Sequence, residues 1–148
     1  MFIALICLFN SCQASEDSTV VLNDGEVWLK YKKSKEKQVT HTGGKIDKIE
    51  IAPSQQFASA NKIIGYYEQE NDIENPTAYT QEPEYSVLII DLTLLKIIAD
   101  LKTPRETTHP LGWQPDDTYR YGEGSPLDIH TYYEFNPATG EIKELNDL

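Results

Sequence analysis

Short segments that alternate apolar and polar residues, separated by turn residues, recur along most of this chain and constrain its fold more than any other feature. Alternation with a period of two places successive side chains on opposite faces of a strand. No segment shows a convincing apolar stripe at the helical period, and the nearest candidate, residues 88–99, is rich in β-branched Ile, which favours strands. The sequence therefore predicts an all-β fold of antiparallel strands.

Turn signals divide the chain into about ten expected strands. Asn23-Asp24-Gly25 is the strongest signal, because Asp-Gly supplies the positive φ angles that a two-residue hairpin turn needs. The strands are expected at residues 20–22, 26–32, 46–51, 62–69, 85–92, 96–101, 118–121, 129–135 and 141–145. Short strands at such spacing are typical of sandwiches and propellers.

The chain of 148 residues is long enough for one core, and we expect a single domain over residues 15–148. Its net charge of −11 repels phosphate backbones and anionic lipid head groups, which argues against a nucleic-acid partner. Seven of the 13 Lys and Arg residues fall within residues 30–48. This basic stretch is interpreted as a solvated strand end or loop, with a contact for an acidic groove as the alternative.

The chain begins with an apolar run, FIALICLF at residues 2–9, that is too short to span a bilayer. Its length suits the apolar region of a secretory signal, so residues 1–14 are predicted to be a signal peptide or lipoprotein signal. The alternative is an ordinary hydrophobic N-terminal strand. Export predicts a periplasmic or outer-envelope lipoprotein, or otherwise a secreted protein.

Two processing sites compete at the end of this segment. Cys12 and Ala14 form a small-x-small cleavage site with a mature start at Ser15, whereas FNSC loosely resembles a bacterial lipobox in which Cys12 becomes lipidated. Both cysteines, Cys7 and Cys12, lie here, so the mature domain is expected to have no internal disulfide and no thiol nucleophile. A lipid at Cys12 would be its only membrane contact.

The later part of the chain contains a weak internal repeat, in which each copy reads as a strand, a Pro-containing turn and a second strand, followed by another hairpin. The matching pairs are residues 49–67 with 111–121 and residues 87–101 with 132–145. Pro53 corresponds to Pro115 at an offset of 62 residues, and the second pairing is offset by 45, so the first copy carries 17 extra residues between its second and third strands. Four short strands per copy are typical of a propeller blade.

The motifs of these copies resemble the TolB-like and dipeptidyl-peptidase-like β-propeller repeat. The resemblance covers residues 46–145 and is carried in the second copy by Trp113, Pro115, Asp116 and Thr139-Gly140-Glu141. It implies an open, partial β-propeller-like stack of antiparallel sheets, because about two and a half blades are fewer than a closed ring needs. A β-sandwich is the alternative, as is a partial ring completed by another copy. The segment 111–124 is then a blade hinge rather than a catalytic corner.

An acidic stretch at residues 68–84 (EQENDIENPTAYTQEPE) holds six carboxylates and no base. It is predicted to be a long loop that is solvated, binds a partner or binds calcium. Tyrosines and a tryptophan also gather in the last third of the chain, where they could anchor an interface. The expected partner-binding residues are Glu70, Asp72, Glu74, Tyr79, Glu82, Trp113, Tyr119 and Tyr121.

Sequence motifs for chemistry are scarce. The three histidines His41, His109 and His130 lack metal-ligand spacing, Ser125 lacks the nucleophile-elbow frame, and HTGGK lacks the phosphate-loop spacing. No catalytic residue, metal or cofactor is therefore predicted, calcium apart. The chain is expected to be an exported non-catalytic protein-binding module. The most specific version of this hypothesis is an inhibitor or immunity-type protein of the cell envelope. The alternatives are a small hydrolase centred on His109 or His130, and an accessory subunit that completes an oligomeric propeller.

Overall fold

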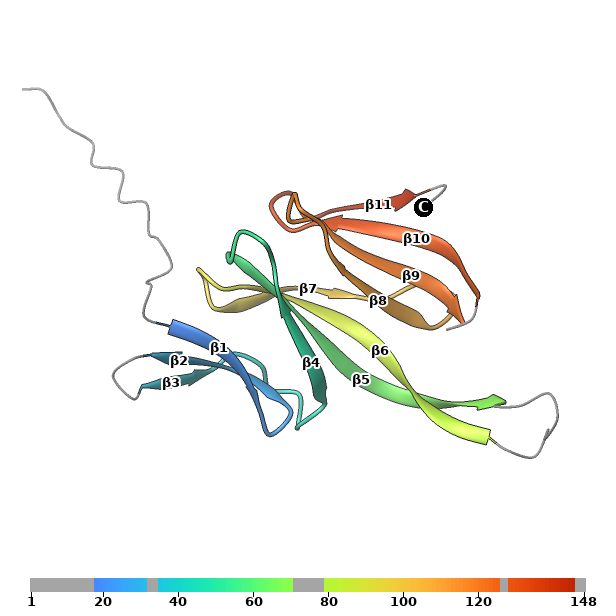
Figure 1. Ribbon diagram of the computed structural model, residues 1–148, viewed down its shortest axis with the longest axis horizontal. Helices are drawn as coiled ribbons and strands as arrows, with labels where there is room; N and C mark the ends of the chain where they lie inside the picture. The colour runs from blue at the N-terminus through green and yellow to red at the C-terminus, as the bar shows by residue number, and fades with distance from the viewer. Residues whose placement is uncertain (1–17, 32–34, 71–78, 126–127, 146–148) are drawn as a thin grey trace, which may run out of the picture.

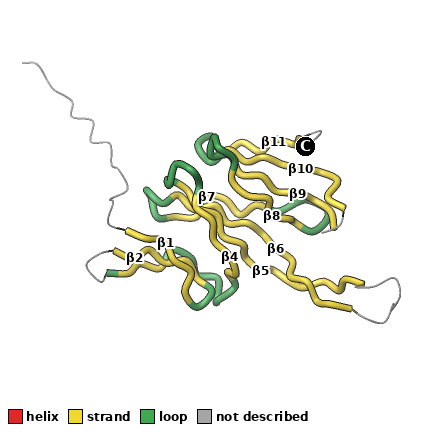
Figure 2. The backbone as a smooth tube through the Cα atoms, in the orientation of Figure 1, coloured by secondary structure: helices red, strands yellow, loops and turns green. Residues whose placement is uncertain are grey.

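The computed structural model describes residues 18–31, 35–70, 79–125 and 128–145, and within them the chain forms eleven strands and no helix (Figures 1 and 2). The strands are β1 (Ser18–Asn23), β2 (Glu26–Tyr31), β3 (Glu36–Gln38), β4 (Ile46–Ile51), β5 (Phe57–Glu70), β6 (Tyr79–Asp91), β7 (Lys96–Leu101), β8 (Thr108–Trp113), β9 (Tyr119–Ser125), β10 (Asp128–Asn136) and β11 (Glu141–Leu145). In this part of the chain there is thus no helix that could cross a membrane. The all-β prediction is confirmed.

The strands form a three-stranded sheet, β1-β2-β3, and a larger antiparallel sheet in the order β11-β10-β9-β8-β6-β5-β4, with β7 paired to β6. The larger sheet consists of two four-stranded units, β4–β7 and β8–β11, joined where Tyr85 of β6 pairs with Thr108 of β8. The sheets do not close into a barrel. This arrangement is also compatible with the β-sandwich alternative.

β3 was not predicted from the sequence, and of β8 only the end before Pro115 was predicted, as the first strand of the second repeat copy. β8 contains Pro110, which cannot donate a backbone hydrogen bond, and its register with β9 shifts between Pro110 and Gly112. β3 has three residues, Glu36–Gln38, all polar or charged. Neither strand carries the apolar alternation from which strands are inferred.

The β1–β2 hairpin has the predicted turn. Asp24 and Gly25 adopt φ angles of 50° and 68°, and Asn23 pairs with Glu26. Positive φ at both central residues is the hairpin geometry that matches strand twist. A side chain at Gly25 would also be blocked, because its Cβ would lie 2.3 Å from the carbonyl oxygen of Gly44.

The first turns of the two four-stranded units have the same geometry. Gln55 in the β4–β5 turn has a φ of 61°, and Asp117 in the β8–β9 turn has a φ of 63°. Each donates its backbone N–H to the carbonyl three residues earlier, Ala52 at 2.9 Å and Gln114 at 3.0 Å. The offset is the 62 residues expected from the sequence repeat.

The second hairpins of the two units also correspond. In the β6–β7 turn the Asp91 carboxylate accepts two backbone N–H groups, and in the β10–β11 turn the Asn136 side-chain oxygen does the same. Leu95 and Gly140, 45 residues apart, both have positive φ, at 52° and 75°. The Asx side chain therefore fixes the turn even where Leu replaces Gly.

β6 lies between two hydrophobic cores. Leu88 and Ile90 face a core shared with the three-stranded sheet, β4 and β5, whereas Val87 and Ile89 face a core shared with β7, β9 and β10. All four side chains are 3% exposed or less. The three-stranded sheet, the β4–β7 unit and the β8–β11 unit thus pack as successive layers, and residues 87–90 of β6 form a continuous apolar run because both faces of the strand are buried there.

The connection from β3 to β4 is organised by the buried carboxylate of Glu26. It accepts hydrogen bonds from the Thr40 hydroxyl, from the backbone and hydroxyl of Thr42, and from the backbone of Gly44 at 3.0 Å. Burial raises the pKa of Glu26, but these hydrogen bonds outweigh it and lower the pKa to about 2. The carboxylate is therefore charged at neutral pH and is a structural group.

Candidate functional site

β5 and β6 continue past the rest of the sheet and form a projecting hairpin (Figures 1 and 2). β4 pairs with β5 only as far as Lys62, and β8 meets β6 only at Tyr85. Beyond these points, and within the described residues, β5 and β6 pair with each other alone, out to Glu70 opposite Tyr79. We call residues 63–70 and 79–85 the hairpin arm.

The prediction of a loop over residues 68–84 is wrong for the residues that the structure describes there. Residues 68–70 and 79–84 are strand, and they account for part of the extra length of the first repeat. Residues 71–78, which include Asp72 and Glu74, lie outside the described residues. Tyrosine, threonine and glutamine pair well across strands, which explains why an acidic segment can extend a hairpin.

A β-bulge marks the start of the arm. The β5–β6 register shifts between Ile63 and Gly65, so Ile64 is the extra residue. A Cβ at Gly65 would lie 3.1 Å from Oε2 of Glu84, and glycine therefore lets this carboxylate lie against the β5 backbone. Bulges bend and twist a strand, and here the bulge lies where the arm leaves the body of the protein.

Tyrosines and carboxylates gather at the base of the arm. The Tyr85 hydroxyl donates to the Asp47 carboxylate of β4. Burial raises the pKa of Tyr85 well above its usual value, and the hydrogen bond with Asp47, its charge and that of Glu82 raise it further. Burial and then Glu82 likewise raise the pKa of Tyr67. These tyrosines therefore keep their protons, so they can donate hydrogen bonds but cannot serve as bases.

Tyr66 is an exposed aromatic residue of the arm. Its side chain is 62% exposed, and it pairs across the strands with Pro83. Glu82 pairs with Tyr67, and Glu68 pairs with Gln81. Residues 63–85 contain six acidic residues and no Lys or Arg. The arm therefore presents an aromatic surface within a strongly negative segment.

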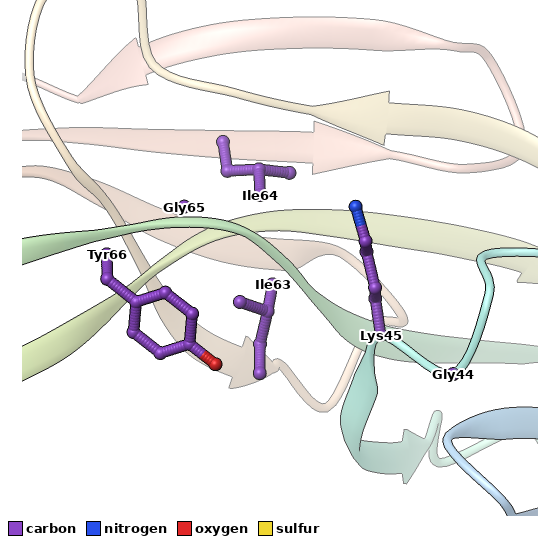
Figure 3. Close-up of a pocket in the computed structure, with 6 residues that line it drawn as sticks. All are labelled: Gly44, Lys45, Ile63, Ile64, Gly65 and Tyr66. Atoms are coloured by element: carbon purple, nitrogen blue, oxygen red, sulfur yellow. The ribbon is translucent and has the colours of Figure 1, made fainter.

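A pocket of about 200 Å³ lies beside the base of the arm, where the chain enters β4 (Figure 3). It is lined by Gly44, Lys45, Ile63, Ile64, Gly65 and Tyr66. The backbone N–H of Ile63 donates to the Lys45 carbonyl at 2.8 Å, which fixes the two walls relative to each other. The pocket is open and partly apolar, and has room for one side chain of a bound molecule.

The structure places the predicted partner-binding residues in different regions of the protein. Glu82 lies on the arm. Glu70 and Tyr79 form the outermost described strand pair of the arm, and the structure describes their backbone but not their side chains. Cys12 lies outside the described residues, as do Asp72 and Glu74. The arm thus gathers the described acidic members of the predicted set.

Three aromatic members of that set, Trp113, Tyr119 and Tyr121, pack in the body of the protein. Tyr119 and Tyr121 are 0% and 2% exposed, and Tyr121 stacks on Tyr133 at 5.2 Å between ring centroids. Trp113 is half-buried between Phe57 and Tyr119, and its Nε1 donates to the Glu50 carbonyl at 3.4 Å. Tyr119 and Tyr121 are core residues in this structure, which a partner cannot reach without local opening.

The two adjacent carboxylates of the segment 111–124, Asp116 and Asp117, are engaged in turn hydrogen bonds. Oδ1 of Asp116 accepts hydrogen bonds from the backbone and hydroxyl of Thr118, and these lower the pKa of Asp116. Oδ1 of Asp117 instead accepts the backbone N–H of Ser54 at 2.9 Å and so ties together the corresponding turns of the two units. The two carboxylates have separate structural partners and do not share a proton.

Two of the three histidines, His109 and His130, are held by local contacts. Nε2 of His109 lies 2.7 Å from the Gly124 carbonyl, and His130 lies 3.2 Å from the Glu106 carboxylate, with both side chains of that pair about half exposed. Among the residues that the structure describes, no three His, Cys, Asp or Glu side chains come together as metal ligands. This geometry gives no support to a particular hydrolytic centre, and the hydrolase alternative stays an untested prediction.

Sequence reasoning missed Tyr66, Tyr67, Tyr85 and Asp47 as parts of the candidate site, whereas Glu84 lies in the acidic stretch it had singled out. The sequence IIGYY at residues 63–67 held a usable signal, because two adjacent tyrosines in one strand must lie on opposite faces and a two-stranded arm cannot bury both. Asp47 carried no local signal, since its partner Tyr85 is 38 residues away.

Comparison with protein-family models finds no match, and none of the curated proteins matches either. Among solved structures, the chain is similar to an uncharacterized protein of Listeria monocytogenes EGD-e, with 13% sequence identity and a TM-score of 0.55. The match covers 91% of this chain and 38% of that one. At this identity the likeness supports the fold alone.

Proposed function

We propose that this chain is an exported, non-catalytic protein-binding module whose hairpin arm contacts the basic surface of a protein partner. The observation that carries the proposal is the arm itself. It pairs with no third strand along residues 65–70 and 79–84 of the described structure, and it presents Tyr66 and Glu68 on one face and Glu82 and Glu84 on the other. An isolated two-stranded ribbon is marginally stable in water, so such an arm gains most from a binding partner.

The chemistry of the arm favours a cationic partner. Six acidic residues without a neutralising base give residues 63–85 a negative potential, and this steers basic surfaces toward the arm and speeds their association. The exposed Tyr66 ring offers a surface on which Arg or Lys can stack. An inhibitor or immunity-type protein of the cell envelope, whose arm enters the basic cleft of an enzyme, is the most specific form of this proposal.

The finer description of the fold belongs to the same proposal. The matched turns of the β4–β7 and β8–β11 units and their face-to-face packing support an open, propeller-like stack that serves as a rigid base for the arm. Export, and lipidation at Cys12, would place this base at the cell envelope with the arm free to reach its partner.

Affinity capture from the native envelope tests the function. The immobilised mature domain is compared with a variant carrying Glu68→Gln, Glu82→Gln and Glu84→Gln on the arm. A matched control carries Glu106→Gln, Glu141→Gln and Glu144→Gln, which remove the same charge from exposed sites outside the arm. We expect the arm variant to lose a protein that the wild-type domain and the control both retain. Equal retention by all three, or no specifically retained protein, would contradict the proposal.

A further inference from the structure

The outer edge of β5 is open along the hairpin arm. β4 covers this edge from Ala58 to Lys62, and the last backbone hydrogen bond on this side runs from the Ile63 N–H to the Lys45 carbonyl at 2.8 Å. From Gly65 to Glu70, the described register pairs of β5 are all with β6. An uncovered strand edge presents N–H and C=O groups to which another extended chain can pair.

The pocket lies at the point where that open edge begins. Gly44 and Lys45 form its wall on the β4 side, and residues 63–66 of β5 form the other (Figure 3). β4 enters the sheet here, so a segment that followed β5 outward would continue the line of β4 along the arm. Its first side chain would reach a pocket of about 200 Å³ that is walled in part by Ile63 and Ile64.

The opposite edge of the arm is less suitable. β6 contains Pro83, which has no N–H to donate, and β8 approaches this edge at Tyr85. β5 has no proline between Ile63 and Glu70. The bulge at Ile64 lies at the start of the edge and leaves the register unbroken from Gly65 outward.

The charge of the arm specifies the occupant. Glu68 is exposed on β5, and Glu82 and Glu84 lie across from Tyr67 and Gly65 on β6. A strand added to β5 would therefore run past carboxylates on both faces of the ribbon. At the base of the arm, Lys45 lines the pocket. Its positive charge would repel a basic side chain, so an apolar side chain of the added strand suits the pocket better.

We propose that an extended basic segment of the protein partner adds to the free edge of β5 as an extra strand, with an apolar side chain in the pocket at the base of the arm. The inference rests on the proposed function and specifies its mode of recognition. Backbone hydrogen bonds supply much of the affinity in this mode, and alternate side chains supply specificity.

A synthetic peptide of alternating Lys and Val residues, labelled for fluorescence anisotropy, tests this mode with the full chain. A second peptide has the same side chains but is N-methylated at two consecutive central residues, which blocks both of its hydrogen-bonding edges. Both peptides are titrated against wild-type protein, the arm variant and the matched control variant described above. We expect N-methylation and the arm variant each to weaken binding by about tenfold or more, and the control variant to bind as wild type does.

The other outcomes separate the mode from the function. If the N-methylated peptide binds as tightly as the parent while the arm variant still binds weakly, strand addition is overturned and the acidic arm is retained as the binding surface. If the arm and control variants bind the peptide equally, then neither strand addition nor the acidic arm explains binding of this peptide, and both proposals are overturned. Failure of the parent peptide to bind the wild-type protein also overturns strand addition.

Discussion

Glu26 is a buried charged residue that links two parts of the described structure. Its carboxylate accepts hydrogen bonds from Thr40, Thr42 and Gly44, and so ties the three-stranded sheet to the entry of β4. That entry also forms one wall of the pocket beside the arm. Hydrogen bonds to a buried charge are stronger than neutral ones, and removing the charge leaves several donors with a weaker partner.

Replacing Glu26 with Gln should lower the free energy of unfolding by about 2 kcal/mol at pH 7. The pKa of Glu26 falls from 4.5 to about 2 on folding, so its contribution is complete above pH 4.5 and is lost as the pH falls through 2. Urea unfolding of both proteins between pH 7 and pH 2 should show the difference shrinking with acid. Glu36→Gln, at an exposed ion pair with Lys30, is the control and should change stability little. A constant difference across this range would contradict the account.

Two glycines with the same backbone conformation should respond differently to alanine. Gly25 and Gly140 have φ angles of 68° and 75°, but a Cβ at Gly25 would meet the Gly44 carbonyl at 2.3 Å, whereas nothing lies within 4 Å at Gly140. Gly140→Ala should cost only the left-handed strain of about 1 kcal/mol. Gly25→Ala should cost about 3 kcal/mol or more, because backbone must move as well. Equal losses in urea unfolding would show that the Gly25–Gly44 contact is not tight.

The hairpin arm is an element added to the two cores rather than a part of them. No described residue beyond Tyr85 on the arm belongs to either hydrophobic core. Along most of their length the described arm strands pair with no third strand, so their stability comes from the cross-strand pairs between β5 and β6. An element of this kind can be removed with little effect on the rest of the fold.

Replacing residues 66–83 with Asn-Gly should leave the body of the protein folded. Gly65 and Glu84 are paired, so a two-residue turn can join them directly. The free energy of unfolding should change by less than about 1 kcal/mol, since neither core loses a residue. The same variant should retain no partner in affinity capture. A large loss of stability would show that the arm supports the fold instead of serving a partner.

The sequence allowed the elements to be predicted where turn chemistry is local. The bounds of β4, β7 and β11 match the expected strands, because turn residues such as Asp91 and Asn136 act within their own hairpins. The inner part of the arm on β5 was predicted as a strand at residues 62–69, but residues 68–84 were predicted as a loop, because their acidic composition hides cross-strand pairs such as Tyr67 with Glu82. Alternation also fixes which residues share a face but not which face is buried, and this is why Tyr121 was expected at an interface.

The whole molecule depends on β6, which gives alternate side chains to two cores. Val87 and Ile89 face the β8–β11 unit, and Leu88 and Ile90 face the three-stranded sheet. Since one strand belongs to both cores, unfolding of either outer layer would expose one apolar face of β6 and destabilise what remains. The protein should therefore behave as a single cooperative unit despite its three layers.

The two tryptophans report on the two ends of this stack. Trp28 lies in the three-stranded sheet and Trp113 in the β8–β11 unit, so Trp113→Phe and Trp28→Phe each leave one probe. Fluorescence-detected urea unfolding of each single-tryptophan protein should coincide with its own circular-dichroism transition. Ile89→Ala or Ile90→Ala introduced into either protein should shift both signals together, by about 3 kcal/mol. Separate midpoints for the two probes would show that the layers unfold independently.

Amide hydrogen exchange, measured by mass spectrometry on the full chain with and without the captured partner, tests most directly whether the arm is the binding surface. The account predicts slower exchange on binding in peptides that cover residues 63–70 and 79–85, with β1–β3 and β8–β11 unchanged. Protection confined to β1–β3 or β8–β11, with the arm exchanging as fast as in the free protein, would contradict it.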